Sequence, residues 1–180
     1  MKLVAGLLFS LFTLSVAGQS PKRMIKKLGS DPVFFVDSVS VDRSELSKYQ
    51  PTEIAAVSVY KDSNAIKLLG PEGKDGVVYI VTKAFAKKKY WAYFTSKSAA
   101  YAALVPTPES DTAIQYILNS KILTSNFEGD LSLITDSLFK AITILDKETL
   151  QTKYGISGKT NGVWIQADKP GDLYRAKKKF

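Results

Sequence analysis

Apolar and polar positions recur in one order along two segments of the chain. The first segment reads PVFFVDSVSVD, QPTEIA and AVSVYKDSNAIKLLGPEGKDGVVYIVTK, and the second reads AIQYILNSKIL and KAITILDKETLQTKYGISGKTNGVWIQAD. Short runs rich in β-branched residues predict strands, and the polar stretches between them predict turns and short helices. Each segment therefore predicts the order strand, turn, short strand, helix, strand, helix, strand. This is an α+β pattern in duplicate.

Turn and cap residues support the alignment of the two segments. Setting Gly70 against Gly155 brings several further turn residues into line, with one inserted residue before Gly162. Glycine adopts positive φ without strain, and Asp and Asn tolerate tight turns. Asp62 and Asp146 each suit the N-cap of a two-turn helix. The predicted structural turn positions are Asp37, Gly70, Gly73, Gly76, Asn119, Gly155, Gly158 and Gly162.

A segment rich in aromatic and basic residues separates the two copies. Trp91, Phe94, Ser98 and Tyr101 follow helical spacing, and Pro106 follows the stripe. More aromatic residues than one helix face can bury often mark an interface. The alternative is that the stripe packs on the sheets of its own two halves. The candidate interface residues are Tyr90, Trp91, Tyr93, Phe94 and Tyr101.

The first residues have the three parts of a cleavable secretory signal peptide. Lys2 supplies the positive charge, residues 3–14 form a short apolar run, and small residues precede Gln19. The run is shorter than the ~20 apolar residues of a membrane span, and no later segment is apolar enough to replace it. The predicted parts are the signal peptide 1–18, N-terminal segment 19–31, first repeat 32–85, helical linker 86–110, second repeat 111–168 and basic tail 169–180.

Composition excludes several classes of function. The chain has no Cys, so we expect neither a disulfide framework nor a lipid-anchored lipoprotein. It also has no His, which removes Ser-His-Asp and Cys-His centres and the usual zinc or copper sites. We therefore expect no metal and no cofactor. The net charge of +8, in an exported protein, favours anionic envelope surfaces or acidic partners over nucleic acid.

The remaining residue types could form two further kinds of site, a phosphate-binding loop or a pair of catalytic carboxylates. The stretch GISGKT lacks the glycine spacing of a phosphate-binding loop, and a strand rather than a helix is expected after it. Carboxylates such as Asp37, Asp42, Asp62 and Asp75 would support a glycan hydrolase only if two of them faced each other across a cleft. The sequence therefore predicts a protein that is not an enzyme.

The first repeat resembles the plug domain of TonB-dependent outer-membrane receptors of the SusC/RagA-like kind. Residues 32–41, 50–62 and 68–83 match its motifs in order, and LLGPEGKDGVVYIVTK is the most specific of them. The second repeat is similar mainly through ITILDKE and YGISGKTNGVWI. In that family the plug sits inside a β-barrel and gates nutrient import. The resemblance implies two plug-like units, each a small mixed sheet with short helices, joined by a helical linker.

The chain also departs from that family. We expect no barrel after Phe180, so transport by this chain alone is not expected. Ser38 and Ser120 replace the glycine that follows the turn residue, and no clear TonB-contact segment precedes Asp31. The expected function is a non-enzymatic periplasmic or secreted protein that binds an envelope component, with an outer-membrane receptor or its transport complex as the candidate partner. The alternative is a soluble periplasmic peptide- or glycan-binding protein, which a deep aromatic pocket would favour; an exposed flat patch or open sheet edge would favour a protein partner.

Overall fold

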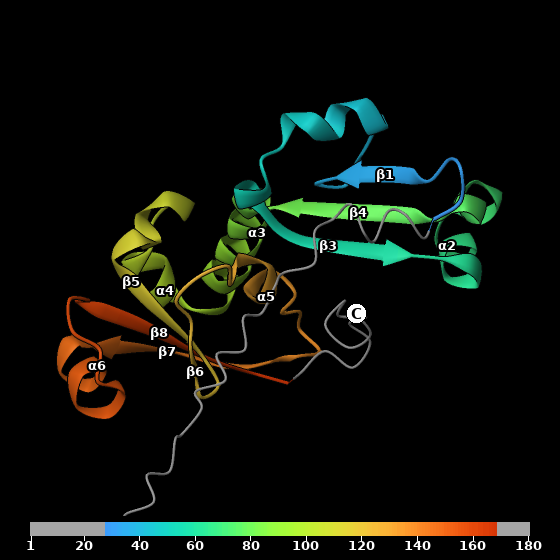
Figure 1. The fold of residues 1–180 in the computed structure, drawn as a ribbon. Helices are drawn as coiled ribbons and strands as arrows, with labels where there is room; N and C mark the ends of the chain where they lie inside the picture. The colour runs from blue at the N-terminus through green and yellow to red at the C-terminus, as the bar shows by residue number, and fades with distance from the viewer. Residues whose placement is uncertain (1–27, 169–180) are drawn as a thin grey trace, which may run out of the picture.

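The computed structural model describes residues 28–168 (Figure 1). These residues form an α+β protein with two four-stranded mixed sheets and several short helices. The predicted fold class is thereby confirmed. The predicted signal peptide, most of the N-terminal segment and the basic tail at 169–180 lie outside the described residues.

The first unit, residues 32–85, forms a mixed sheet with the strand order β2-β1-β4-β3. β1 runs parallel to β4. The two edge strands pair antiparallel with their neighbours, β2 with β1 and β3 with β4. Figure 1 shows α2 at the end of the sheet that lies away from α3. The strands are β1 (Val33–Val36), β2 (Val39–Val41), β3 (Ile54–Tyr60) and β4 (Val77–Thr82). The connections contain α2 (Asp62–Leu69) and the 3₁₀ helices η1 (Arg43–Lys48), η2 (Pro51–Glu53) and η3 (Gly70–Asp75).

The second unit, residues 111–168, repeats this topology with the strand order β6-β5-β8-β7. β5 runs parallel to β8, and β6 and β7 are antiparallel edge strands. The strands are β5 (Ile114–Leu118), β6 (Lys121–Ile122), β7 (Phe139–Asp146) and β8 (Asn161–Ala167). The helices are η4 (Pro108–Ala113), α5 (Glu128–Ser132) and α6 (Lys147–Tyr154).

Strand registers align the two units residue by residue. Val59 pairs with Val78 in the first unit, and Ile144 pairs with Val163 in the second. Both of these edge strands also carry a bulge near their first residue, at the same place in the register. A bulge inserts one unpaired residue and bends the strand, so its recurrence makes a chance likeness improbable. The two units are therefore structural copies of each other.

This register corrects one feature of the sequence alignment. Because Val78 corresponds to Val163, Gly76 corresponds to Asn161 and Val77 corresponds to Gly162. The predicted one-residue insertion, which set Gly76 against Gly162, is wrong. The spacing between the units is constant from the third strand to the fourth.

A turn residue ties the first strand to the last in each unit. The Asp37 carboxylate accepts hydrogen bonds from Thr82 N at 2.8 Å and Thr82 Oγ1 at 2.7 Å. The Asn119 side chain accepts from Ala167 N at 3.1 Å and donates to Ala167 O at 3.0 Å. Asp37 and Asn119 have φ values of 51° and 54°, a region that Asp and Asn enter more readily than most residues. Ser38, in place of the expected glycine, has a φ of 71°.

The helices that follow the third strands begin differently. Asp146 caps α6 by accepting a hydrogen bond from Thr149 N at 2.8 Å. In α2 the N-cap is Lys61, and no side chain provides a capping hydrogen bond. Asp62 is the first residue inside the helix, with a φ of 50°. The predicted cap is thus confirmed for Asp146 and wrong for Asp62.

The linker consists of two helices, α3 (Lys83–Lys97) and α4 (Ala99–Leu104). Thr82 Oγ1 accepts from Phe85 N at 3.1 Å, so α3 begins directly where β4 ends. Ser98 adopts an extended backbone with φ of −149°, and its side chain accepts from Tyr101 N at 3.1 Å. A Ser in this conformation is a preferred N-cap, so the single predicted helix is interrupted here.

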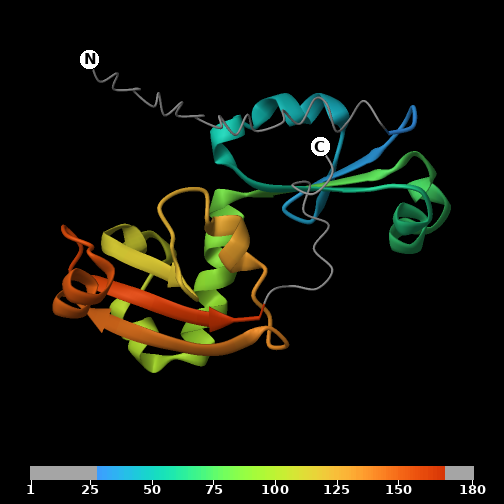
Figure 2. The ribbon, with the colours of Figure 1, turned by 60° about the horizontal axis from the view of Figure 1, so that its bottom comes forward.

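The main core lies where the linker helices meet the second sheet. Figures 1 and 2 show α3 between the two sheets, with α5 beside it. Residues from α3, α4 and α5 pack with β5 and β8 into one cluster of buried apolar side chains. A smaller cluster under α6 joins Ile117, Leu145 and Leu150. The members of the main core are Tyr90, Phe94, Tyr101, Val105, Ile114, Tyr116, Leu123, Leu131, Ile134, Val163, Ile165 and Ala167.

Candidate interaction surface

Three of the five aromatic residues predicted as an interface belong to the core. Tyr90, Phe94 and Tyr101 are at most 1% exposed. The ring centroids of Phe94 and Tyr101 lie 5.7 Å apart in an edge-on contact, and Tyr90 meets Tyr116 at the same distance. Because α3 and α4 pack over the second sheet, these rings cannot reach a partner while the protein is folded. The interface hypothesis is wrong for these three residues, and the alternative of packing on the protein's own sheet applies.

Trp91 and Tyr93 are half-buried at the margin of the same core. Trp91 Nε1 donates to Val105 O at 2.8 Å, which ties α3 to the end of α4. Tyr93 OH donates to Asp136 Oδ1 at 2.8 Å, and Lys97 Nζ lies 2.7 Å from the same oxygen. Desolvation and this hydrogen bond raise the pKa of Tyr93 to about 12. For these two residues the interface remains a prediction.

A buried polar network anchors α3 to the second sheet. Asp111 is 6% exposed and accepts a hydrogen bond from Tyr90 OH at 2.7 Å, while Lys87 Nζ lies 2.5 Å from its other oxygen. Tyr101 OH and Tyr116 OH lie 2.9 Å apart beside it. Burial raises the pKa of Tyr90 and Tyr116 far above the usual range, and that of Tyr101 to about 12. The hydroxyl groups therefore stay protonated and act as neutral donors, which suits a structural role.

The predicted turn residues occupy two kinds of position. Gly73 lies buried in η3, where a Cβ would collide with the carbonyl of Ala65. Gly162 lies inside β8 rather than in a turn, and a Cβ there would be 2.7 Å from Leu150 Cδ2. Its prediction as a turn is therefore wrong, since the close approach of α6, not the backbone conformation, requires glycine. The glycines with positive φ are Gly70, Gly76, Gly155 and Gly158.

Exposed apolar side chains concentrate at the α2 end of the first unit. Tyr60, Ile66 and Leu68 are 37%, 46% and 44% exposed. They lie within nine consecutive residues at the end of β3 and in α2 (Figure 1). Ile66 and Leu68 are two positions apart in the helix, so they leave α2 on nearly opposite sides and are exposed on both flanks of it. Single exposed apolar residues are ordinary on protein surfaces, whereas a local group of them is typical of an interaction site.

The second unit has different side chains at the same positions. α2 and α6 each have eight residues and start at corresponding positions, so they align end to end. Lys153, which corresponds to Leu68, lies over the ring of Trp164 at 5.1 Å from its centroid. The counterpart of Tyr60 is 8% exposed and packs against α6. The residues that correspond to Tyr60, Ile66 and Leu68 are Leu145, Gln151 and Lys153.

An aromatic ladder runs from Tyr60 across the first sheet. Phe35 and Tyr79 are paired in the β1–β4 register and stack with centroids 4.6 Å apart and an interplanar angle of 9°. Tyr60 meets the Tyr79 ring edge-on at 6.1 Å. Phe35 and Tyr79 are half-buried, so their rings are partly open to solvent. We call the five residues Phe35, Tyr60, Ile66, Leu68 and Tyr79 the α2-end surface.

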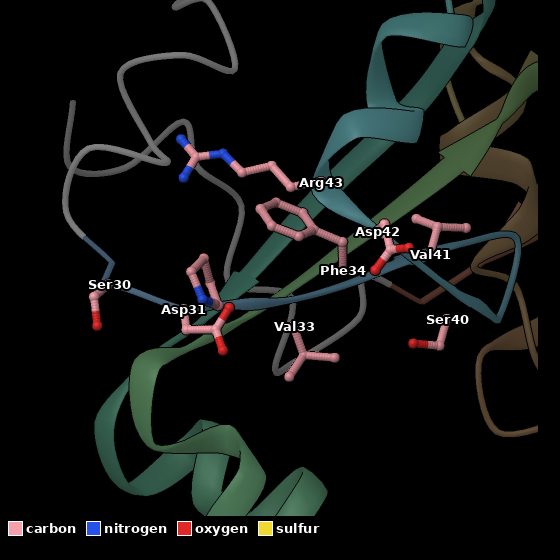
Figure 3. Close-up of a pocket in the computed structure, with 9 residues that line it drawn as sticks. Ser30, Asp31, Val33, Phe34, Ser40, Val41, Asp42 and Arg43 are labelled. Atoms are coloured by element: carbon pink, nitrogen blue, oxygen red, sulfur yellow. The ribbon is translucent and has the colours of Figure 1, made fainter.

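The first unit also has a shallow polar pocket at the start of β1 (Figure 3). Its volume of about 220 Å³ is smaller than the ~300–1,000 Å³ of typical ligand sites. Phe34 is its one aromatic lining residue. Asp31 and Asp42 are exposed on its rim, and the Arg43 side chain points away from the Asp42 carboxylate (Figure 3). This is not the deep aromatic pocket that the peptide- or glycan-binding alternative predicts.

Sequence reasoning missed the α2-end surface because it looked for aromatic excess in the linker. The signal was present in the repeat itself, where Ile66 and Leu68 stand opposite Gln151 and Lys153. A surface helix that is apolar in one copy and polar in the other indicates a function that the copies do not share.

The remaining observations bear on broader classes of function. Over residues 28–168, no three His, Cys, Asp or Glu side chains come together as metal ligands. In the same range, none of the helices combines the length and apolar character needed to cross a bilayer. Comparisons with protein-family models, curated proteins and solved structures each found no match.

Proposed function

We propose that this is a non-enzymatic, exported envelope protein that binds another envelope protein, an outer-membrane receptor or its transport complex. The α2-end surface of the first unit is the binding site. The resemblance of residues 32–41, 50–62 and 68–83 to receptor plugs points to the outer membrane as the place of the partner.

One observation carries the proposal. Two matched helices in one chain differ at their exposed positions, because α2 presents Ile66 and Leu68 where α6 presents Gln151 and Lys153. Solvent alone would favour polar side chains on both helices. Exposed apolar side chains on a helix at one end of a sheet, together with partly open aromatic rings on that sheet, are typical of a protein–protein interface.

The second unit provides the substitutions for a direct test. Ile66→Gln with Leu68→Lys gives α2 the side chains of α6, and Gln151→Ala with Lys153→Ala is the matched control on α6. Tagged wild-type protein and both variants are used to capture partners from detergent-solubilised outer membranes of the native host. We expect wild-type and control proteins to recover the same barrel receptor, and the α2 variant to lose it.

Folding is checked on the same samples. Surface substitutions away from special backbone positions usually change the free energy of unfolding by less than ~0.5 kcal/mol. Both variants should therefore melt close to wild type. Equal recovery of the receptor by all three proteins, with unchanged melting, would contradict the proposal.

A further inference from the structure

We infer that the outer edge of β3 accepts an extended segment of the partner, which joins the first sheet as an added strand. The inference rests on the proposed function, since it concerns how the same partner is held. It follows from the direction of the backbone groups along β3, from what blocks the two ends of this edge, and from the side chains that flank it.

The direction of the backbone groups in β4 is fixed by its hydrogen bonds to β1. Val33 N donates to Gly76 O at 3.0 Å, and Asp37 N donates to Ile80 O at 3.0 Å. Backbone groups of successive residues in a strand point to opposite sides. The backbone N–H and C=O groups of Gly76, Val78 and Ile80 therefore point toward β1. Those of the residues between them, including Tyr79, point toward β3.

This alternation fixes the backbone groups of β3 as well. Ser58 is paired with Tyr79, so its N–H and C=O point inward to β4. The N–H and C=O of Val57 and Val59 consequently point away from the sheet. Among residues 28–168, no strand pairs with this side of β3, and no hydrogen bond to these four groups is present.

Both ends of the open edge are closed by the protein itself. At the first end, Gly129 of α5 packs so closely on Ala55 that a Cβ there would lie 2.8 Å from the Ala55 carbonyl oxygen. At the other end, the Lys61 carbonyl accepts from Asn64 N at 3.0 Å and Ala65 N at 3.3 Å. The edge therefore offers the two donors and two acceptors of Val57 and Val59, enough to position a short strand.

The side chains around this edge define the chemistry of the partner segment. β3 has no charged residue along Ile54–Tyr60; the exposed Tyr60 is its last residue, and α2, with the exposed Ile66 and Leu68, follows it directly. The corresponding edge strand β7 has Lys140 where β3 has Ala55, and a charge on an edge strand opposes the docking of another strand. The partner segment that fits is extended, uncharged and apolar at the side chains facing α2.

A second copy of this chain fits less well. Antiparallel pairing of two β3 strands that joins Val57 to Val59 across the contact sets Lys61 of one copy opposite Ala55 of the other. α5 already occupies that place. A separate receptor segment can leave the edge before it reaches α5, so we commit to a receptor segment as the occupant.

The test combines a photoreactive probe with removal of the outward donors. p-Benzoylphenylalanine replaces Ser58, whose side chain lies on the face of Tyr79, and Thr143 is the corresponding control position in β7. Native outer membranes are illuminated with each protein. A second set carries Val57→Pro with Val59→Pro, which removes two outward N–H groups without breaking a bond to β4. Ile142→Pro with Ile144→Pro is its control in β7.

We expect the Ser58 probe to crosslink to one receptor segment and the Thr143 probe to give no such product. Losing two hydrogen bonds should lower the Ser58 yield on the order of tenfold in the β3 proline variant, with no loss in the β7 variant. A crosslink that survives the β3 proline substitutions but disappears with Ile66→Gln and Leu68→Lys would overturn the strand inference and leave the proposed function standing. No crosslink and no capture would overturn both. A crosslink to a second copy would replace the receptor as the occupant and overturn this assignment.

Backbone amide exchange in the wild-type protein gives a reading that does not depend on folding of the proline variant. Without a partner, the Val57 and Val59 amides should exchange faster than the Ser58 amide, because only the Ser58 amide bonds to β4. Adding the captured receptor should slow Val57 and Val59 and leave Ile142 and Ile144 unchanged. Unchanged exchange at Val57 and Val59 would contradict the inference.

Discussion

The first and second units share a backbone and differ in how their side chains are used. The two units have the same strand order, the same pairing directions, a bulge at the same place in an edge strand, and a turn residue, Asp37 or Asn119, that hydrogen-bonds to the end of the last strand. The second unit packs its sheet against α3, α4 and α5 around the main core. The first unit presents Tyr60, Ile66 and Leu68 to solvent instead. The difference is the one expected if the second copy supplies stability while the first copy, as proposed, binds a partner.

The largest expected effect tests whether the main core dominates stability. Phe94→Ala empties a site that is 0% exposed and should cost ~3–5 kcal/mol, a large share of the ~5–15 kcal/mol that keeps a typical domain folded. Phe35→Ala in the half-buried ladder should cost clearly less, roughly 1–2 kcal/mol. Urea unfolding followed by circular dichroism measures both. Equal losses of unfolding free energy would show that the two units contribute equally to stability, which would contradict the difference drawn between them.

The second expected effect is a loss of stability at alkaline pH that arises from the buried tyrosines of the main core. Burial raises the pKa of Tyr90, Tyr101 and Tyr116 in the folded protein, while unfolded tyrosines ionise near pH 10. The stabilisation is therefore complete below pH 10 and is lost as pH rises above it. The slope is up to ~1.4 kcal/mol per pH unit for each buried tyrosine.

Melting curves at several pH values between 9 and 12, with tyrosine ionisation followed by absorbance, measure this dependence. A Tyr90→Phe, Tyr116→Phe double variant should show a shallower decline, because two of the ionising groups are gone. A decline of the same steepness in wild type and variant would assign the alkaline sensitivity to other residues.

A smaller effect distinguishes two glycines that the sequence made look alike. Gly76→Ala strains a backbone with φ of 102° and brings its Cβ to 2.5 Å from Leu28 Cδ2, whereas Gly162→Ala has no such backbone strain and collides with Leu150. Each should cost ~1–3 kcal/mol. In a Leu150→Ala background the cost of Gly162→Ala should shrink, while that of Gly76→Ala should not change. Thermal unfolding of the double variants measures this coupling. Equal coupling of both glycines to Leu150 would contradict the difference proposed between them.

The smallest expected effect concerns the starts of the matched helices. Asp146→Ala removes the cap of α6 and should lower the melting temperature slightly at neutral pH, whereas Asp146→Asn keeps a capping oxygen and should lower it less. The hydrogen bond from Thr149 N lowers the pKa of Asp146, so the charged cap stabilises at neutral pH and is lost as pH falls through that pKa. The gap between wild type and Asp146→Ala should therefore close in acid. A gap that is constant with pH would contradict a charged cap.

Much of the fold could be read from the sequence because each unit is locally consistent. β-Branched runs bounded by Asp, Asn and Gly predict the strands and turns without knowledge of the tertiary structure. The misplaced insertion arose because Gly76 and Gly162 are glycine for different reasons: Gly76 has a positive φ and the close approach of Leu28, and Gly162 has only the close approach of α6 and its neighbours. Sequence pattern alone carries no information on which of these reasons applies.

The candidate site was harder to predict, for a different reason. Helical spacing placed Phe94 and Tyr101 on one stripe, but burial depends on the sheet that packs there, which is built from residues further along the chain. Comparing the two units position by position would have identified Ile66 and Leu68, since the matched helix is polar there. Comparison of matched positions in the two repeats was thus the most informative sequence evidence for the candidate surface.

The direct passage of β4 into α3 also has a mechanical consequence. A partner bound at the α2 end and a second unit held in place would pull on β4 along its own axis. β4 is already extended, so this tension runs along its covalent backbone into α3 and does not open its hydrogen bonds to β1 and β3 one by one. We expect force applied between residues 66 and 83 to lengthen α2 and η3 before the sheet opens, whereas force applied between residues 54 and 82, which are paired at one end of β3 and β4, should peel the two strands apart at lower force; optical tweezers can measure both. A short extended strand, rather than a large core, would then carry the load between the partner and the second unit.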